Sequence, residues 1–161
     1  MNKEKQVKKT AQIKGEVYAA EDSLISNGVS CMAKGQAIYI GSGAVIMDNS
    51  QITSTEDFPV KIGQKVIVGQ SCKINGANIG NFCEIGNNVQ IGEGAYIGDY
   101  AILEEGCVLP NGAKVPSRAV ATGDPFSVVR GLTIEDFDKI KERCQGDVSL
   151  SSLALEKLEE Q

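Results

Sequence analysis

An aliphatic residue recurs every six positions through the middle of this chain. From residue 62 the series has one step of five and otherwise steps of six, and its members are Ile62, Val68, Ile74, Ile79, Ile85, Ile91, Ile97, Leu103, Leu109 and Val115. A small or branched residue lies two positions before each later member, and a turn-forming residue, most often glycine, usually follows. Because side chains alternate across a strand, each unit predicts a short β-strand with two inward side chains and one outward one. A tight corner must then follow.

Single strands of this kind cannot bury their inner faces, whereas stacked coils of them can. The sequence therefore predicts an all-β fold, a single-stranded parallel β-helix of hexapeptide repeats. The pattern resembles known hexapeptide β-helices, which implies three hexapeptides per coil, a triangular prism and a left-handed superhelix. The register extends back to Ile13, with a loop extruded at residues 53–59. We expect about five coils.

Three segments follow from this pattern. We expect residues 1–10 to form a basic, flexible N-terminus, residues 11–122 to form the left-handed β-helix, and residues 123–161 to form a cap and a C-terminal helical segment. Within the last segment, Thr133 is a plausible helix N-cap and Asp136 completes a capping box. A second short amphipathic helix is expected over residues 149–160.

The outward residues sort into three columns, one for each side of the prism. One column is mostly polar, and a second contains Tyr18, Tyr39 and Tyr96. The third reads Leu24, Val45, Ile67, Glu84 and Ile102. Four aliphatic residues among five outward positions predict a contact surface.

We expect the predicted α-helix to fold back and pack on this third side. Ile134, Phe137, Ile140 and Cys144 share one face of that helix. The candidate interaction residues, with the chain's own helix or with a partner, are therefore Leu24, Val45, Ile67, Ile102, Ile134, Phe137 and Ile140.

The composition argues against several kinds of chemistry. The 161 residues include no histidine, which is the commonest zinc ligand and the side chain best matched to proton transfer near pH 7. The cysteines of the repeats lie at inward positions and should be small buried hydrophobes. We therefore expect no catalytic residue, no cofactor and no metal site, and hence no enzyme.

Charge, hydropathy and cysteine spacing limit the partners and the location. The formal charge of −5 argues against a nucleic-acid or anionic-membrane surface. No apolar run reaches the roughly 18 residues of a membrane span. Five cysteines without a C-x-x-C pair favour free thiols in the cytoplasm.

Three stretches resemble the β-helical pointed-end subunits of dynactin. They are residues 15–52 (GEVYAAEDSLISNGVSCMAKGQAIYIGSGAVIMDNSQI), 62–98 and 108–124. The resemblance implies a non-enzymatic scaffold that pairs end to end with the other β-helical subunit, similar to dynactin subunit 5. Through it the chain would join the actin-related protein of the pointed end in a hetero-oligomer. It also implies a cytoskeletal location and a role in dynein–dynactin cargo or adaptor binding during microtubule-based transport.

Two alternatives remain open. The ending GDPFSVVRGLTIEDF, residues 123–137, is similar to the ending of γ-carbonic anhydrases, which would imply a scaffold subunit of mitochondrial respiratory complex I. The other alternative is a hexapeptide-repeat acyltransferase with an unusual base. It would need an acyl-CoA or sugar-nucleotide site in the groove between chains.

Overall fold

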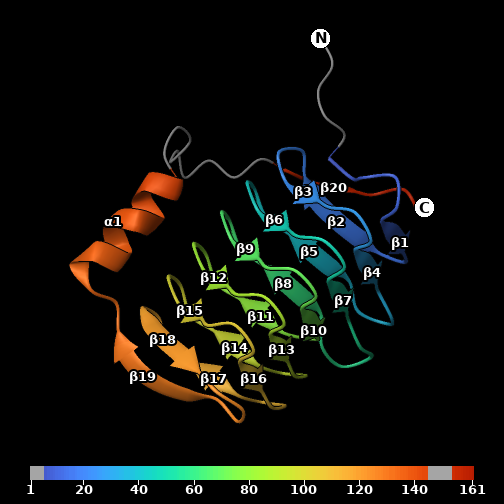
Figure 1. Cartoon of the computed structure of the whole chain (residues 1–161). Coiled ribbons are helices and arrows are strands. Elements are labelled where there is room, and N and C mark those ends of the chain that lie inside the picture. The colour runs from blue at the N-terminus through green and yellow to red at the C-terminus, as the bar shows by residue number, and fades with distance from the viewer. Residues whose placement is uncertain (1–5, 145–153) are drawn as a thin grey trace.

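Three largely parallel β-sheets surround one hydrophobic core, and from β1 to β18 successive strands belong to different sheets (Figure 1). The computed structural model describes residues 6–144 and 154–161. Every third strand along the chain is a hydrogen-bonded neighbour, so three consecutive strands make one coil of a left-handed parallel β-helix. The predicted fold class is therefore confirmed.

The first sheet, which we call the polar sheet, has six strands and carries the polar outward column. In order across the sheet they are β1 (Gln12–Lys14), β4 (Ser30–Met32), β7 (Gln51–Thr53), β10 (Lys73–Asn75), β13 (Gln90–Ile91) and β16 (Val108–Leu109).

The second sheet, the tyrosine sheet, has seven strands and carries Tyr18, Tyr39 and Tyr96 outward. Its strands are β17 (Lys114–Val115), β14 (Tyr96–Ile97), β11 (Asn78–Ile79), β8 (Val60–Ile62), β5 (Ile38–Ile40), β2 (Val17–Ala20) and β20 (Leu155–Lys157). All pairings are parallel except that of β2 with β20.

The third sheet, the aliphatic sheet, also has seven strands and carries the apolar outward column. Its strands are β19 (Ser127–Gly131), β18 (Ala119–Thr122), β15 (Ile102–Leu103), β12 (Glu84–Ile85), β9 (Ile67–Val68), β6 (Val45–Ile46) and β3 (Leu24–Ile25). In this sheet the pairing of β18 with β19 is antiparallel, and the other pairings are parallel.

The register agrees with the predicted columns and shows one more coil than expected. Ile67 pairs with Val45 and Glu84 pairs with Ile67, as the third column requires. Every member of the series from Ile62 to Val115 is buried. Val120 in β18 pairs with Ile102 and is the sixth member of the apolar column. The β-helix thus has about six turns rather than five, because the column continues one coil beyond Ile102.

The N-terminal end of the prism is closed by segments from both ends of the chain. Val7 forms a parallel bridge with Ile25, and β20 pairs with β2. The predicted helix over 149–160 is therefore wrong for residues 155–157, and residues 149–153 lie outside the described residues. An extended segment at this edge satisfies the backbone groups of the first coil, which a helix would leave unpaired.

The C-terminal end is closed by the residues that directly follow the last coil. The chain turns back so that β19 pairs with β18, and Phe126 packs against the core. Helix α1 (Ile134–Arg143) follows, with Thr133 and Asp136 forming the predicted capping box. Within the described part of the chain, no helix has the length and hydropathy needed to cross a bilayer.

Candidate functional site

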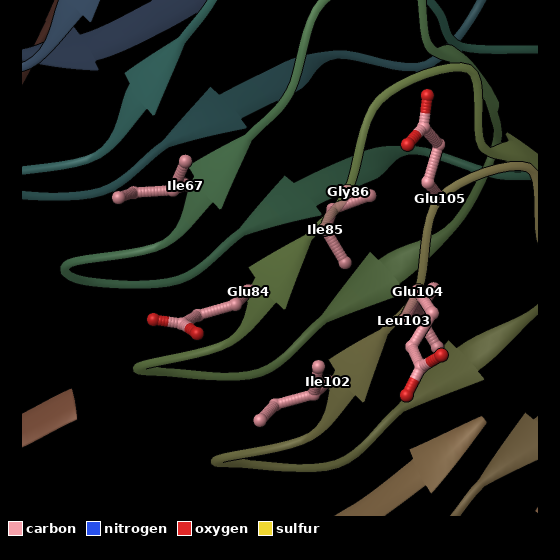
Figure 2. A pocket seen from close by; sticks show the side chains of 8 residues that line it. All are labelled: Ile67, Glu84, Ile85, Gly86, Ile102, Leu103, Glu104 and Glu105. Atoms are coloured by element: carbon pink, nitrogen blue, oxygen red, sulfur yellow. The ribbon is translucent and has the colours of Figure 1, made fainter. Parts of the chain in front are cut away.

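An open cavity of about 410 Å³ lies on the outer side of the aliphatic sheet. We call it the face cavity, and it is lined by Ile67, Glu84, Ile85, Gly86, Ile102, Leu103, Glu104 and Glu105. Figure 2 shows Ile67, Glu84 and Ile102 one above another on β9, β12 and β15. Glu104 and Glu105 follow β15, at the other end of the strands (Figure 2). The cavity therefore combines aliphatic walls with three carboxylates.

Glu84 is the one ionisable residue of the apolar column, and an ion pair fixes its position. Arg143, the last residue of α1, donates from Nε to Glu84 Oε2 at 3.0 Å and from Nη1 to the Lys65 carbonyl at 2.7 Å. Its Nη2 is buried and, among the described residues, has no hydrogen-bond partner. A half-buried ion pair with an added backbone hydrogen bond orients both side chains. Glu84 thus anchors the helix and presents a carboxylate to the cavity.

A stack of residues at the corners of the prism contacts the N-terminal half of α1. Phe82 and Tyr100 occupy corners one coil apart in the left-handed conformation, with φ of 60° and 61°, and their rings stack at 5.0 Å. Phe137 of α1 packs on Tyr100 at 5.3 Å, and the Arg118 guanidinium lies 5.3 Å from the Phe137 ring. We call these four residues the corner ladder. This ladder was not predicted from the sequence, although the 18-residue spacing of Phe82 and Tyr100 indicates that one coil separates them.

The structure places the predicted interaction residues in several different environments. Ile67 and Ile102 line the face cavity, whereas Leu24 and Val45 lie half-buried on the N-terminal coils of the same sheet. In α1, Ile140 is buried and Phe137 belongs to the corner ladder. Ile134 is 83% exposed. The helix meets the aliphatic sheet at Glu84 and along its corner, and the face cavity stays open between the outward side chains.

A smaller concavity of about 220 Å³, the loop groove, lies on the tyrosine sheet. Its lining includes Phe58 from the predicted loop, together with Lys61, Asn78 and Tyr96. Phe58 lies over two glycines: a Cβ at Gly76 would come 2.8 Å from the Phe58 Cβ, and one at Gly94 would come 3.2 Å from Phe58 Cζ. This groove has a lysine and two exposed aromatic rings but no carboxylate in its lining.

All five cysteines are free and buried. Burial raises the pKa of the Cys31 and Cys83 thiols to about 12, and that of Cys107 to about 11. Thiols with such pKa values are poor nucleophiles, because the thiolate is the reactive form. Among the described residues, no group of three His, Cys, Asp or Glu side chains is placed to hold a metal ion. Cys31, Cys72, Cys83 and Cys107 pack in the core, as their inward positions predict, and Cys144 is buried at the end of α1.

The face cavity is the better candidate for chemistry. A carboxylate can accept a proton or hold a cationic group, and the aliphatic walls can pack against the apolar part of a ligand. Glu84 is partly shielded from solvent, whereas Glu104 and Glu105 are exposed. The charge of Glu84 is paired with Arg143, and the exposed carboxylates Glu104 and Glu105 favour a positively charged ligand, such as a protonated amine.

The comparisons with known proteins identify the repeat and the fold. A family model described as bacterial transferase hexapeptide (six repeats) matches residues 76–111. No curated protein matches the chain. A solved structure of a candidate acetyltransferase from Bacillus cereus is similar at 24% identity and a TM-score of 0.65, covering 89% of this chain and 87% of that one.

A second solved structure is similar over most of both chains. It is a hexapeptide transferase family protein from Anaplasma phagocytophilum, at 24% identity and a TM-score of 0.59, with 85% of this chain and 84% of that one covered. At these identities the likeness supports the left-handed β-helix. The residues matched by the repeat model include Glu84, Ile102, Glu104 and Glu105 of the face cavity.

These findings correct two expectations from the sequence. The matches named above are transferases rather than dynactin subunits, so the resemblance to dynactin is wrong, and with it the dynein, microtubule and cytoskeletal roles. The expectation of a non-enzymatic protein is contradicted as well. Its physical basis was the missing histidine, which removes an imidazole base but leaves carboxylates able to accept a proton. The expected hetero-oligomeric partners stay a prediction, but the resemblance to dynactin no longer supports it.

Proposed function

We propose that this protein is a hexapeptide-repeat acyltransferase that acylates a primary amine held in the face cavity. The observation that carries the proposal is Glu84, a carboxylate placed between Ile67 and Ile102 in a cavity of about 410 Å³. The match of residues 76–111 to a transferase repeat supports the same region as the site.

The chemistry assigned to the cavity follows from its charges. A protonated amine is attracted by Glu104 and Glu105, and it must lose a proton before it can attack a carbonyl carbon. A carboxylate within hydrogen-bond distance can take that proton. The free amine then attacks the carbonyl of an acyl thioester such as acetyl-CoA, a C–N bond forms and the C–S bond breaks. A proton passes from the nitrogen to the departing sulfur, which leaves as a thiol. Glu84 is the residue that we propose as base, and Glu104 and Glu105 attract the amine.

Arg143 has a positioning role in this proposal. Its bonds to Glu84 Oε2 and the Lys65 carbonyl hold the carboxylate in one orientation and tie α1 to the coils. A base must be oriented as well as ionised, so loss of this arginine should weaken catalysis without abolishing it.

The test is release of free thiol from acetyl-CoA in the presence of a panel of primary amines, including amino sugars and polyamines. We expect turnover with at least one amine, and a decrease in kcat of about 100-fold or more for Glu84→Gln, as for loss of a general base. Glu105→Gln is the matched control, because Glu105 is exposed at the margin of the cavity, and it should change KM for the amine more than kcat.

The Arg143→Gln variant separates catalysis from helix anchoring. It breaks the same ion pair but keeps the carboxylate, so it should retain more activity than Glu84→Gln. If neither thiol release nor a thermal shift with acetyl-CoA is seen for the folded protein, the proposal is wrong. Equal losses in Glu84→Gln and Arg143→Gln would make Glu84 a structural anchor only.

We place this activity in the cytoplasm. The support is the set of five free cysteines, which fits a reducing compartment.

A further inference from the structure

The C-terminal segment, residues 154–161, is bound to the first coil largely through its backbone. Leu158 N–H donates to the Val17 carbonyl at 2.7 Å. Ile13 and Gln161 exchange both backbone hydrogen bonds, at 3.0 and 3.1 Å. The segment therefore covers the outer edges of two sheets, at β2 and at β1. Backbone pairing of this kind is how an extended peptide adds to a sheet edge.

Three side chains add specificity to this pairing. Leu158 packs against the hydrophobic core at the end of the prism, and Lys157 Nζ lies 3.1 Å from Glu16 Oε1. The Gln161 amide donates to the carbonyls of Lys8 and Ala11 at 3.0 and 3.2 Å. All three residues of β20 are exposed, so only Leu158 of the segment is packed against the core.

We infer that the edge formed by β1 and β2 is a strand-binding site, and that a second copy of this chain can fill it with its own residues 154–161. The site takes an extended peptide with leucine at its apolar contact, lysine one residue earlier and glutamine three residues later. Every contact described above is the same whether the segment comes from the same chain or from another. Reciprocal exchange between two copies therefore loses no contact, which is the condition for domain swapping.

A pair of single-cysteine variants tests this inference directly. Tyr18 and Lys157 lie opposite each other in the β2–β20 pairing. The Leu158-to-Val17 hydrogen bond places them at a non-hydrogen-bonded pair, where Cα atoms are about 4.5 Å apart. That is within the range of a disulfide. The native cysteines are buried, so the two introduced thiols should oxidise first.

In the experiment, Tyr18→Cys protein carrying a large tag is mixed with untagged Lys157→Cys protein and oxidised gently. We expect a disulfide-linked heterodimer on a non-reducing gel, increasing with protein concentration. The matched control is tagged Tyr39→Cys protein, because Tyr39 stacks on Tyr18 but lies one coil further from β20, about 9–10 Å by strand spacing. The heterodimer should be several-fold more abundant with Tyr18→Cys than with Tyr39→Cys.

Two further measurements distinguish exchange between two copies from binding of the segment within one chain. Excess synthetic peptide with the sequence of residues 154–161 should suppress the heterodimer, and the same peptide with Leu158→Asp should not. A chain that carries both Tyr18→Cys and Lys157→Cys should form an internal disulfide when dilute. If this internal bond forms but no heterodimer appears, exchange with a second copy is ruled out. If neither bond forms, the strand-binding site itself is wrong.

Discussion

The two ends of this β-helix are closed in different ways. At the C-terminal end, β19 and Phe126 follow directly on the last coil, so the cap is local in the sequence. At the N-terminal end, the edges of the first coil are covered by residues 6–8 and by residues 154–161. Ile13 and Gln161 pair although they lie near opposite ends of the chain.

The difference shows which part of the molecule completes the fold. A local cap can form as soon as the last coil is made, whereas the N-terminal cap needs the whole chain, because loop closure over a long separation must precede its contacts. An uncovered edge would be a template for pairing with another chain. The C-terminal segment therefore protects the molecule at the end where its own neighbouring sequence cannot.

The largest expected effects compare the cores of the two terminal coils. Ile13 lies in the first coil and Leu109 in the last, and both are essentially inaccessible to solvent. Replacing either by alanine should lower the free energy of unfolding by about 2–5 kcal/mol, the usual cost of an emptied core site. Urea unfolding of Ile13→Ala and Leu109→Ala measures both. A much smaller loss for Ile13→Ala would mean that the chain ends seal the first coil less tightly than β19 seals the last.

Intermediate decreases in the free energy of unfolding are expected for the side chains that pack against the core at each end of the prism. Leu158 and Phe126 are partly buried against the core, so truncation to alanine should cost roughly half the value of full burial, about 1–1.5 kcal/mol, and more for the larger Phe126. Hydrogen exchange separates the two ends: Leu158→Ala should speed exchange of the Ile13 amide, and Phe126→Ala should not. Equal acceleration by both variants would contradict independent caps.

The smallest effects concern one carboxylate near each end. The Arg130 guanidinium, with the Thr133 backbone N–H, holds the pKa of Asp136 at about 2, below its ordinary 3.8. Asp136 should therefore stabilise the fold above about pH 4, and this contribution should be lost as the pH falls toward 2. At the other end, the Tyr18 hydroxyl and then Lys157 lower the pKa of Glu16.

Thermal unfolding and NMR test this last comparison. The Tm of Asp136→Asn should lie below that of the parent protein at neutral pH, and the two should converge near pH 2. Glu16 is exposed, so its effect should appear only as a lowered carboxyl pKa in an NMR titration, rising in a Tyr18→Phe variant. A Tm difference for Asp136→Asn that persists unchanged at pH 2 would rule out ionisation as its source.

The sequence predicts the parts of the fold that repeat. Six-residue spacing places the inward series from Ile62 to Val115 and the outward columns, because each coil obeys the same alternation as the one before it. The capping box at Thr133 and Asp136 is equally predictable, since it depends on residues three apart.

The parts that sequence reasoning missed depend on contacts between distant residues. β20 binds through backbone groups, which every residue has, so its leucine pattern fits a helix as well as a strand. In the candidate site, Ile67 and Ile102 were predicted as a contact surface, but Glu84 had no assigned role. Its partner Arg143 lies 59 residues away, and only the position of α1 brings the two together.

The buried thiols give this molecule a set of internal reporters. Cys31 lies in the second coil, Cys72 and Cys83 lie in the fourth and Cys107 lies in the sixth, whereas Cys144 lies at the end of the helix. Each coil touches only its neighbours, so opening can begin at one level without disturbing the rest. A thiol reagent therefore reacts first with the cysteine in the part of the β-helix that unfolds first. The order in which the five cysteines react shows whether unfolding begins at the N-terminal or the C-terminal end.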